Sequence, residues 1–355
     1  MAARSGISGQ VPSSRRATVT GIAVTLFVAV AGLMWAKWVP YVGKALHAAR
    51  TGQWSGSDIL HTGVVAADDG PSWHAATTFF TAYVGAIWPA LVVAVVLSAC
   101  VQAFLPRSWL AGLLNRRRAV SSAAAGAAAG MPSMMCACCS APVAVTLRRS
   151  GVDQAAAVAY WLGNPLLNPA VVVFLALVAP WQWTVTRLVV GVGAVIGAAV
   201  LVARLAPAAV QPNSAAAQPI SDTRPAGVRF LASLARLCVV LIPEYFVMVL
   251  AIGAFRGWLL TIAAPEHRSL LVIVAVAIVG TLIVIPTAGE IPILQGLALL
   301  GASSGVLGAL LITLPAVSLP GIAMVVQTFG RRATAVISAV VVGAGLVGAL
   351  ALSIA

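Results

Sequence analysis

The stretch Ser121-Ser-Ala-Ala-Ala-Gly-Ala-Ala-Ala-Gly-Met-Pro-Ser-Met-Met-Cys-Ala-Cys-Cys-Ser-Ala-Pro142 decides the fold of this chain. Its first ten residues are small and allow helices to pack closely. Pro132 and Pro142 interrupt the apolar segment from Ala119 to Leu147, which therefore cannot form one continuous helix. The basic pair Arg148-Arg149 follows directly. A hairpin of two broken helices, returning to the side where it began, accounts for both the prolines and this charge.

The composition excludes a water-soluble globular domain. Hydrophobic residues make up 61% of the chain and charged residues only 8%, whereas soluble domains carry about 25% charged residues. The net charge of +13 comes mostly from single or paired basic residues at the ends of apolar segments. Such charges set membrane topology and form no surface for nucleic acid. We expect a multi-pass protein of the inner (cytoplasmic) membrane, in contact with membrane lipids.

Four regions follow from the distribution of charge and proline. We expect an N-terminal transmembrane helix and external loop in residues 1–73, a first membrane repeat in 74–205, a cytoplasmic linker in 206–228 and a second membrane repeat in 229–355. The first helix, residues 17–36, is too long for a signal peptide and is followed directly by Lys37. Arg187 would lie outside the membrane. Further helices are expected over residues 77–105, 155–180, 188–203, 237–255, 306–329 and 333–355, with a second Pro-interrupted hairpin in 270–300.

The two halves share residues at one constant offset. The matches, 150 residues apart, are Pro142 with Pro292, Leu147 with Leu297, Gly151 with Gly301, and Pro165 with Pro315. Each half would contain three crossings and one hairpin, so the second half would enter the membrane in the opposite sense. The predicted fold is an all-α inverted-repeat transporter with a Pro-broken hairpin in each half and an extra N-terminal helix. The alternative is a bundle whose helices are merely kinked by proline.

The first hairpin carries a cluster of sulfur-containing side chains. Cys136, Cys138 and Cys139 are candidate substrate contacts and tentative metal ligands, and Met134 and Met135 are further candidates. Thiolates and thioethers are soft ligands that favour Cu(I), Zn(II) and similar thiophilic species, a class to which trivalent arsenic belongs. Cys136 and Cys138 can converge only if the backbone there is not helical. Ordinary core packing of free thiols is the alternative.

Two carboxylates lie in apolar segments. Glu290, in the second hairpin, and Glu244 are candidates for proton coupling, and Glu290 also for substrate contact, because a carboxylate inside a membrane is costly and usually functional. The alternative is an internal ion pair with Arg236 or Arg256.

Two asparagines lie where a long helix is expected to break. Asn164 and Asn168 belong to the sequence Gly163-Asn-Pro-Leu-Leu-Asn-Pro169. An unwound helix exposes backbone polar groups, and the asparagine amides add donors and acceptors for a substrate. Alternatively, the two amides satisfy the freed backbone groups.

These motifs resemble those of a known family. From Pro132 to Pro169 the chain has a proline, closely spaced cysteines, a second proline, a basic residue with glycine, an Ala-rich helix and an Asn-Pro pair. This pattern resembles the predicted permease family that includes the bacterial efflux permease for trivalent organoarsenicals, and Pro286 to Pro320 resembles its second half. The resemblance implies an efflux permease that binds a thiophilic substrate at the cysteines. The adjacent Cys138-Cys139, followed by Ser140, departs from the usual motif.

The leading hypothesis is secondary-active efflux of a thiophilic metal, metalloid or organoarsenical. The sequence contains no phosphate-binding loop for an ATPase, and we expect neither enzymatic activity nor a cofactor. One alternative is a transporter of a small organic anion or thiol compound. Another is a membrane thiol oxidoreductase or metal-insertion factor that uses Cys136 and Cys138. A homo-oligomer is compatible with the sequence.

Overall fold

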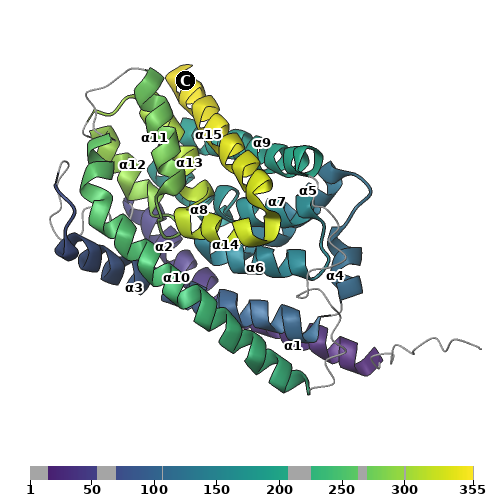
Figure 1. Cartoon of the computed structure of the whole chain (residues 1–355). Helices are drawn as coiled ribbons and strands as arrows, with labels where there is room; N and C mark the ends of the chain where they lie inside the picture. Colours follow the sequence, from purple (N-terminus) through teal and green to yellow (C-terminus); the bar gives the residue numbers. More distant parts are fainter. Residues whose placement is uncertain are drawn as a thin grey trace, which may run out of the picture.

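The computed structural model describes residues 15–53, 69–105, 107–206, 225–262, 270–299 and 301–354, which contain helices and no strand. The all-α prediction is confirmed for these residues, and Figure 1 shows how the helices gather into one bundle. The elements are α1 (Arg15–Leu33), the π-helical turn η1 (Met34–Trp38), α2 (Val39–Thr51), α3 (Trp73–Phe104), α4 (Arg107–Leu114), α5 (Ala119–Gly130), the 3-10 turn η2 (Met131–Ser133), α6 (Ala137–Arg149), α7 (Gln154–Leu166), α8 (Pro169–Val178), α9 (Trp181–Leu205), α10 (Ala226–Ile262), α11 (Leu270–Leu282), α12 (Glu290–Leu299), α13 (Ser304–Ala316), α14 (Leu319–Phe329) and α15 (Arg331–Ile354).

Several helices have the length and composition of membrane spans. Within the described ranges, five segments are long and apolar enough to cross a membrane, and the pair α13 and α14, bent by 53°, would make a sixth. Large apolar side chains on these helices face outward, as Phe27 does with 73% of its surface exposed. An apolar exterior of this kind suits lipid and not water. The chain is a multi-pass membrane protein, as predicted.

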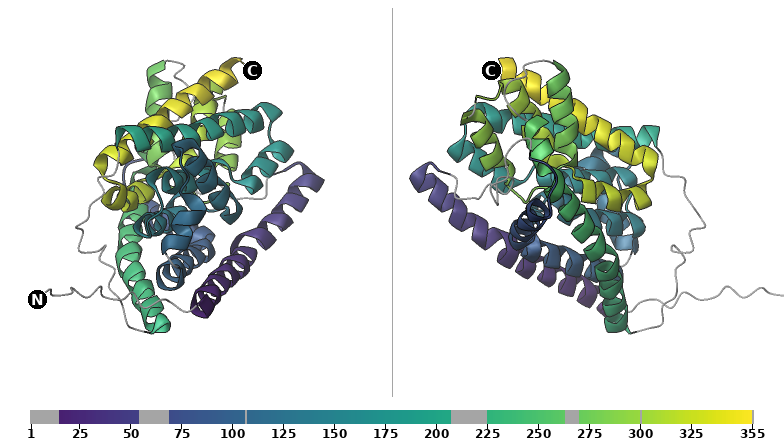
Figure 2. Two further views of the ribbon diagram at one scale, coloured as in Figure 1. Left: turned by 90° about the vertical axis from the view of Figure 1, so that its right-hand side faces the viewer. Right: turned by 60° about the vertical axis from the view of Figure 1, so that its left-hand side comes forward.

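The N-terminal helix is longer than expected. Together α1, η1 and α2 form one rod along the outside of the bundle (Figure 2), and this rod ends at Thr51 instead of residue 36. Lys37 is the first residue after the expected end of the helix. It lies inside the rod and is only 5% exposed. The helix continues past Lys37 because its ammonium donates hydrogen bonds to the hydroxyls of Thr287 and Tyr41 in place of water. The rest of the expected external loop, residues 54–68, lies outside the described residues.

The first hairpin has its break between α5 and α6. These helices have 12 and 13 residues, or about 18 and 20 Å, which is too short to cross a hydrocarbon core of about 30 Å. Asn115, just before α5, donates to the Gly151 carbonyl (3.0 Å) and accepts from the Asp153 amide (2.7 Å). The two ends of the segment are therefore joined, as a hairpin requires. Pro142 lies inside α6 and does not break it.

The second half repeats this order of elements. The helices α13, α14 and α15 begin at residues 304, 319 and 331, each 150 residues after α7, α8 and α9, which begin at 154, 169 and 181. The hairpin of α11 and α12 breaks over residues 283–289, where Ala288 has a left-handed backbone (φ +66°). In each half the last long helix packs on the helix before the Pro break: α9 on α7 and α15 on α13.

Two helices begin earlier than expected. Helix α9 begins at Trp181 instead of residue 188 and contains Arg187, which is fully buried. The expectation that Arg187 lies in an external loop was wrong, because its guanidinium is satisfied by partners inside the bundle. Helix α10 begins at Ala226 and ends at Ile262, beyond both ends of the range expected for it, 237–255.

Small residues bring helix backbones into contact. A Cβ atom added at Gly126 on α5 would lie 2.0 Å from the Ala156 carbonyl oxygen of α7, and one at Gly308 on α13 would lie 2.2 Å from the Gly348 carbonyl oxygen of α15. No real Cβ atom can lie so close to a backbone oxygen. The close packing predicted for the small residues after Ser121 is confirmed.

We predict that Gly126→Ala destabilises the protein. Its methyl group forces α5 away from α7, at a cost of about 1–3 kcal/mol, as is typical of overpacking. Gly197→Ala is the matched control, since a Cβ atom at this position of α9 meets nothing within 4 Å. Thermal unfolding in detergent measures both variants. Equal melting temperatures for Gly126→Ala and Gly197→Ala would contradict the packing described.

Candidate functional site

Three cysteine thiols converge at the break of the first hairpin. The Sγ atom of Cys136 lies 3.2 Å from that of Cys138 and 3.0 Å from that of Cys139. All three sulfur atoms lie within 4.8 Å of one another, and all three side chains are buried. The hydroxyl of Tyr83, on α3, lies 3.0 Å from the Cys138 sulfur. The convergence of Cys136 and Cys138 predicted from the sequence is therefore present.

The local backbone explains this convergence. Met134 is left-handed (φ +50°), and Cys136 is extended (φ −75°, ψ 166°) and precedes the first turn of α6. A residue in that N-cap position directs its side chain toward the residue three positions later, which here is Cys139.

The three sulfur atoms need only small movements to reach the spacing of a soft-metal site. Thiolates at about 2.3 Å from a tetrahedral zinc ion lie about 3.8 Å apart. The Cys136 sulfur, at 3.0 and 3.2 Å from its neighbours, would have to move by less than about 1 Å from each. Three thiols from one short segment can therefore bind one thiophilic centre and leave its fourth position open.

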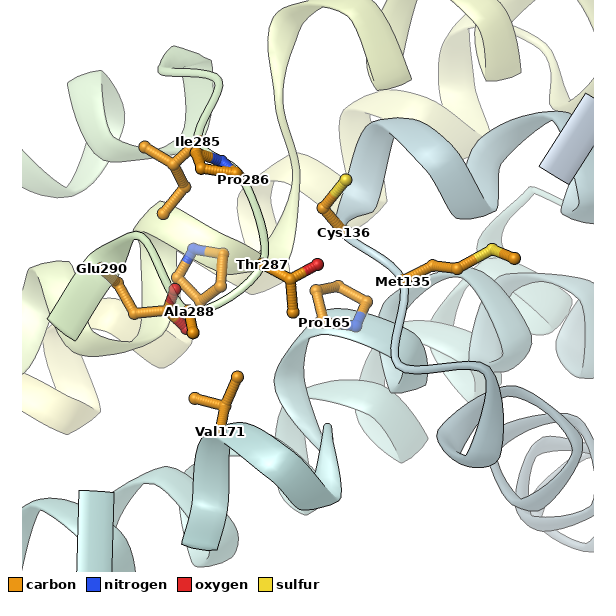
Figure 3. A pocket seen from close by; sticks show the side chains of 10 residues that line it. Met135, Cys136, Pro165, Val171, Ile285, Pro286, Thr287, Ala288 and Glu290 are labelled. Carbon is orange, nitrogen blue, oxygen red and sulfur yellow. The ribbon is translucent and has the colours of Figure 1, made fainter. Parts of the chain in front are cut away.

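A narrow cavity joins the two hairpin breaks (Figure 3). Its enclosed volume of about 10 Å³ is close to what one water molecule needs. The first break contributes Met135 and Cys136, and the side chain of Met135 extends away from Cys136 (Figure 3). The remaining walls are Pro165, Val171, Ile285, Pro286, Thr287, Ala288, Glu290 and Pro315. Segments from both halves of the sequence thus meet at one place.

Lys37 joins this meeting point from the N-terminal helix. Its Nζ atom donates to the Thr287 hydroxyl (2.9 Å) and the Tyr41 hydroxyl (3.3 Å), and Thr287 lines the same narrow cavity as Cys136. The Thr287 hydroxyl in turn donates to the carbonyl oxygen of Met134 (3.4 Å). One ammonium group therefore contacts the second break and lies beside the thiols of the first.

Sequence reasoning missed Lys37. A lysine after 20 apolar residues is typical of the end of a transmembrane helix, and its partner Thr287 is 250 residues away. The one available signal was the continued apolar character of the residues after Lys37. The π-helical turn that contains Lys37 is a feature often found at functional sites.

Asn164 holds the first break in place. Its Oδ1 atom accepts hydrogen bonds from the Ser133 hydroxyl and from the Met135 amide, and its Nδ2 atom donates to the Tyr160 carbonyl (3.0 Å). These bonds support the residues just before Cys136. The structure thus places Asn164 behind the thiols, in contact with the loop that presents them.

Asn168 begins helix α8. Its Oδ1 atom accepts from the amides of Ala170 and Val171, as an N-cap residue does. Its buried Nδ2 atom has no hydrogen-bond partner among the described residues, and neither has the hydroxyl of Ser318, the residue 150 positions later that begins α14. A buried polar atom without a partner is costly, so both atoms are suited to bind water or substrate.

Glu290 is buried and paired with Arg187. Their side chains are 1% and 0% exposed, and Nη2 of Arg187 lies 3.0 Å from Oε1 of Glu290. For Glu290 the alternative of an internal ion pair is met by Arg187 and not by Arg236 or Arg256: Arg236 is exposed, and Arg256 donates to the Thr78 hydroxyl. The second carboxylate oxygen of Glu290 has no partner in the described part of the chain, and Glu290 lines the cavity.

Arg187 also satisfies carbonyl groups that the helix breaks leave open. It donates to the Pro165 and Leu166 carbonyls (2.8 and 2.9 Å), at the end of α7, and to the Leu311 carbonyl (2.6 Å) in α13. The Leu311 carbonyl needs this donor because the residue four positions later is Pro315, which has no N–H. A buried guanidinium thereby links helices of both halves.

In the first half, the carbonyl at the equivalent position has a different hydrogen-bond donor. Pro165 frees the carbonyl of Trp161, which accepts a hydrogen bond from the hydroxyl of Ser140 (3.4 Å). Ser140 stands 150 residues before Glu290, and Trp161 stands 150 residues before Leu311. A serine donates directly to the freed carbonyl in one half, whereas the other half uses a glutamate together with an arginine. The site is therefore asymmetric.

The other predicted carboxylate, Glu244, lies in α10, but its side chain is outside the described residues. The three thiols, Met135, Glu290 and Asn164 are brought to the two breaks, with Lys37 and Arg187 as additional charged groups.

Comparison with known proteins agrees with this architecture. The model of the family ArsP_1, described as predicted permease, matches residues 72–354. The chain is also 38% identical over 337 residues to the UPF0718 protein YraQ of Escherichia coli (strain K12), covering 93% of this chain and 94% of that protein. No solved structure matches. A family match over residues 72–354, together with this relative, shows that the chain belongs to the family of predicted permeases.

Proposed function

We propose that this permease is a secondary-active exporter of the inner membrane, and that its substrate is a thiophilic metal ion, metalloid or organoarsenical. The observation that carries the proposal is the convergence of three buried thiols beside a cavity where helix breaks of both halves meet. Soft ligands bind such substrates strongly. Broken helices near a central cavity are typical of secondary transporters.

The two halves are proposed to form an inverted repeat. The recurrence of helix starts at an offset of 150 residues supports this arrangement, as does the basic pair Arg331-Arg332 at the start of α15, where α9 begins with the aromatic residue Trp181. In such transporters one repeat moves against the other around a fixed site. The substrate at the thiols would then face each side of the membrane in turn.

Glu290 is proposed to couple transport to protons. When Glu290 is ionised it pairs with Arg187, which also holds carbonyls of α7 and α13. Protonation removes the charge of Glu290 and weakens this link between the halves. A proton taken up on one side of the membrane would therefore favour the movement that returns the empty site.

Two other functions are less well supported by the arrangement. A thiol oxidoreductase needs thiols that a partner protein can reach, whereas Cys136, Cys138 and Cys139 are 5%, 1% and 0% exposed. A carrier of small organic anions or thiol compounds is favoured by one observation, the buried ammonium of Lys37 beside the cavity wall.

We predict that Cys136→Ser and Cys138→Ser each reduce substrate transport by at least about tenfold, since even changes outside the first ligand shell cost 10–100-fold in metal affinity. Uptake of zinc, copper or a trivalent arsenical into everted vesicles measures this. Cys100→Ser, a lone buried thiol on α3, is the matched control and should transport normally. Unchanged transport of all three substrates in the Cys136 and Cys138 variants would remove the thiol-based proposal.

We predict that Glu290→Gln retains substrate binding but loses acceleration by a proton gradient, because the amide cannot take up a proton. Arg187→Met should instead lower stability by about 3–5 kcal/mol, since it leaves a buried carboxylate and three carbonyls without their donor. Vesicle uptake with and without a gradient tests the first variant, and thermal unfolding tests the second. Gradient-dependent transport by Glu290→Gln would contradict the coupling role.

We predict that Trp181→Cys and Arg331→Cys react with a membrane-impermeant maleimide from opposite sides of the membrane. The two residues are exposed and stand 150 positions apart, at the starts of α9 and α15, and an inverted repeat places equivalent positions on opposite faces. Trp181→Cys should react in intact cells and Arg331→Cys only in everted vesicles. Labelling of both from the same side would show a parallel repeat.

A further inference from the structure

We infer that Lys37 selects the charge of the bound species, so that the site favours a divalent thiophilic cation held by three thiolates. This inference rests on the proposed function and makes it more specific. It follows from the net charge of the buried groups around the thiols, to which Lys37 contributes one positive charge. The sequence pattern does not reveal that Lys37 is one of these groups.

Lys37 has neutral hydrogen-bond partners. Its ammonium, 95% buried, contacts the hydroxyls of Thr287 and Tyr41 and lies 5.2 Å from the centre of the Tyr41 ring. No carboxylate pairs with it among the residues that the structure describes. A buried cation without a counterion is unfavourable, so an anionic group bound nearby would be stabilised.

The other charges near the cavity cancel or are screened. Arg187 and Glu290 form an ion pair and together contribute no net charge. Lys44, on the far side of Tyr41 along the same helix, is only partly buried, and solvent screens its charge. Before any thiol ionises, the surroundings of the cluster therefore carry one net positive charge, that of Lys37.

Metal binding releases the thiol protons and fixes the charge of the complex. A divalent cation that displaces three thiol protons forms a complex with three thiolates and a net charge of −1, which balances Lys37. A trivalent organoarsenical oxide such as phenylarsine oxide condenses with two thiols: two As–S bonds form, and the oxide oxygen leaves with both thiol protons as one water molecule. The complex is neutral and leaves Lys37 unbalanced. A monovalent ion on three thiolates would carry −2. A monovalent ion on two thiolates would also carry −1, but would leave one of the three converging thiols unused.

The experiment compares substrates that give differently charged complexes. The full-length protein in detergent is titrated with Zn²⁺ and, separately, with phenylarsine oxide, and Co²⁺ serves as a spectroscopic probe of thiolate ligation. In Lys37→Met and Lys37→Gln we expect Zn²⁺ affinity to fall by about tenfold or more, with phenylarsine oxide affinity changed less than about twofold. Lys37→Arg keeps the charge and should retain preference for Zn²⁺.

Trp38→Phe is the control for a merely structural role of this turn. Its indole donates to the Pro132 carbonyl (2.9 Å) and anchors the same helix, without charge, to the hairpin that carries the thiols, so its loss should affect both ligands alike. Equal weakening of both ligands in the two uncharged Lys37 variants would overturn the inference. Wild-type protein that binds phenylarsine oxide but not Zn²⁺ would overturn it while leaving the proposed function intact. Binding of neither ligand would overturn both.

Discussion

A buried guanidinium holds the centre of this protein together. Removing an arginine from water costs several kcal/mol unless every charge and donor is satisfied. Each nitrogen of the Arg187 guanidinium donates: it makes one hydrogen bond to the Glu290 carboxylate of α12 and three to backbone carbonyls of α7 and α13. The prolines that break the long helices also leave backbone carbonyls without a donor. The arginine supplies hydrogen bonds to carbonyls at these breaks. The broken geometry needed at a transport site is stable for this reason.

The two halves satisfy the carbonyls that proline frees in different ways. Each half has a proline that frees one carbonyl, yet the first half supplies a serine hydroxyl and the second a glutamate with a distant arginine. Soft ligands gather at the first break, and permanent charges gather at the second. A side that carries thiols and a side that carries charges thus face one another across a narrow cavity.

Local features of the fold could be predicted from the sequence, whereas long-range partners could not. The hairpin break at Pro132 and the convergence of the cysteines follow from residues close together in the chain. The burial of Glu290 was also predictable, because a carboxylate in an apolar segment is unusual. Its partner was not, since Arg187 is 103 residues away and reads as a loop residue. The place of Lys37 inside a helix could not be predicted for the same reason. A charged residue in an apolar sequence lies at a helix end only if the fold provides no hydrogen-bond partner for it.

The N-terminal rod has a consequence for the lipid environment. It lies before residue 72, where the family match begins, and its 33 residues from Val19 to Thr51 span about 50 Å. A helix longer than the hydrocarbon core tilts to an extent that depends on bilayer thickness. Lys37 lies near the middle of this rod, beside the thiols. A change in the tilt of this helix would therefore move the charge of Lys37 relative to the thiols.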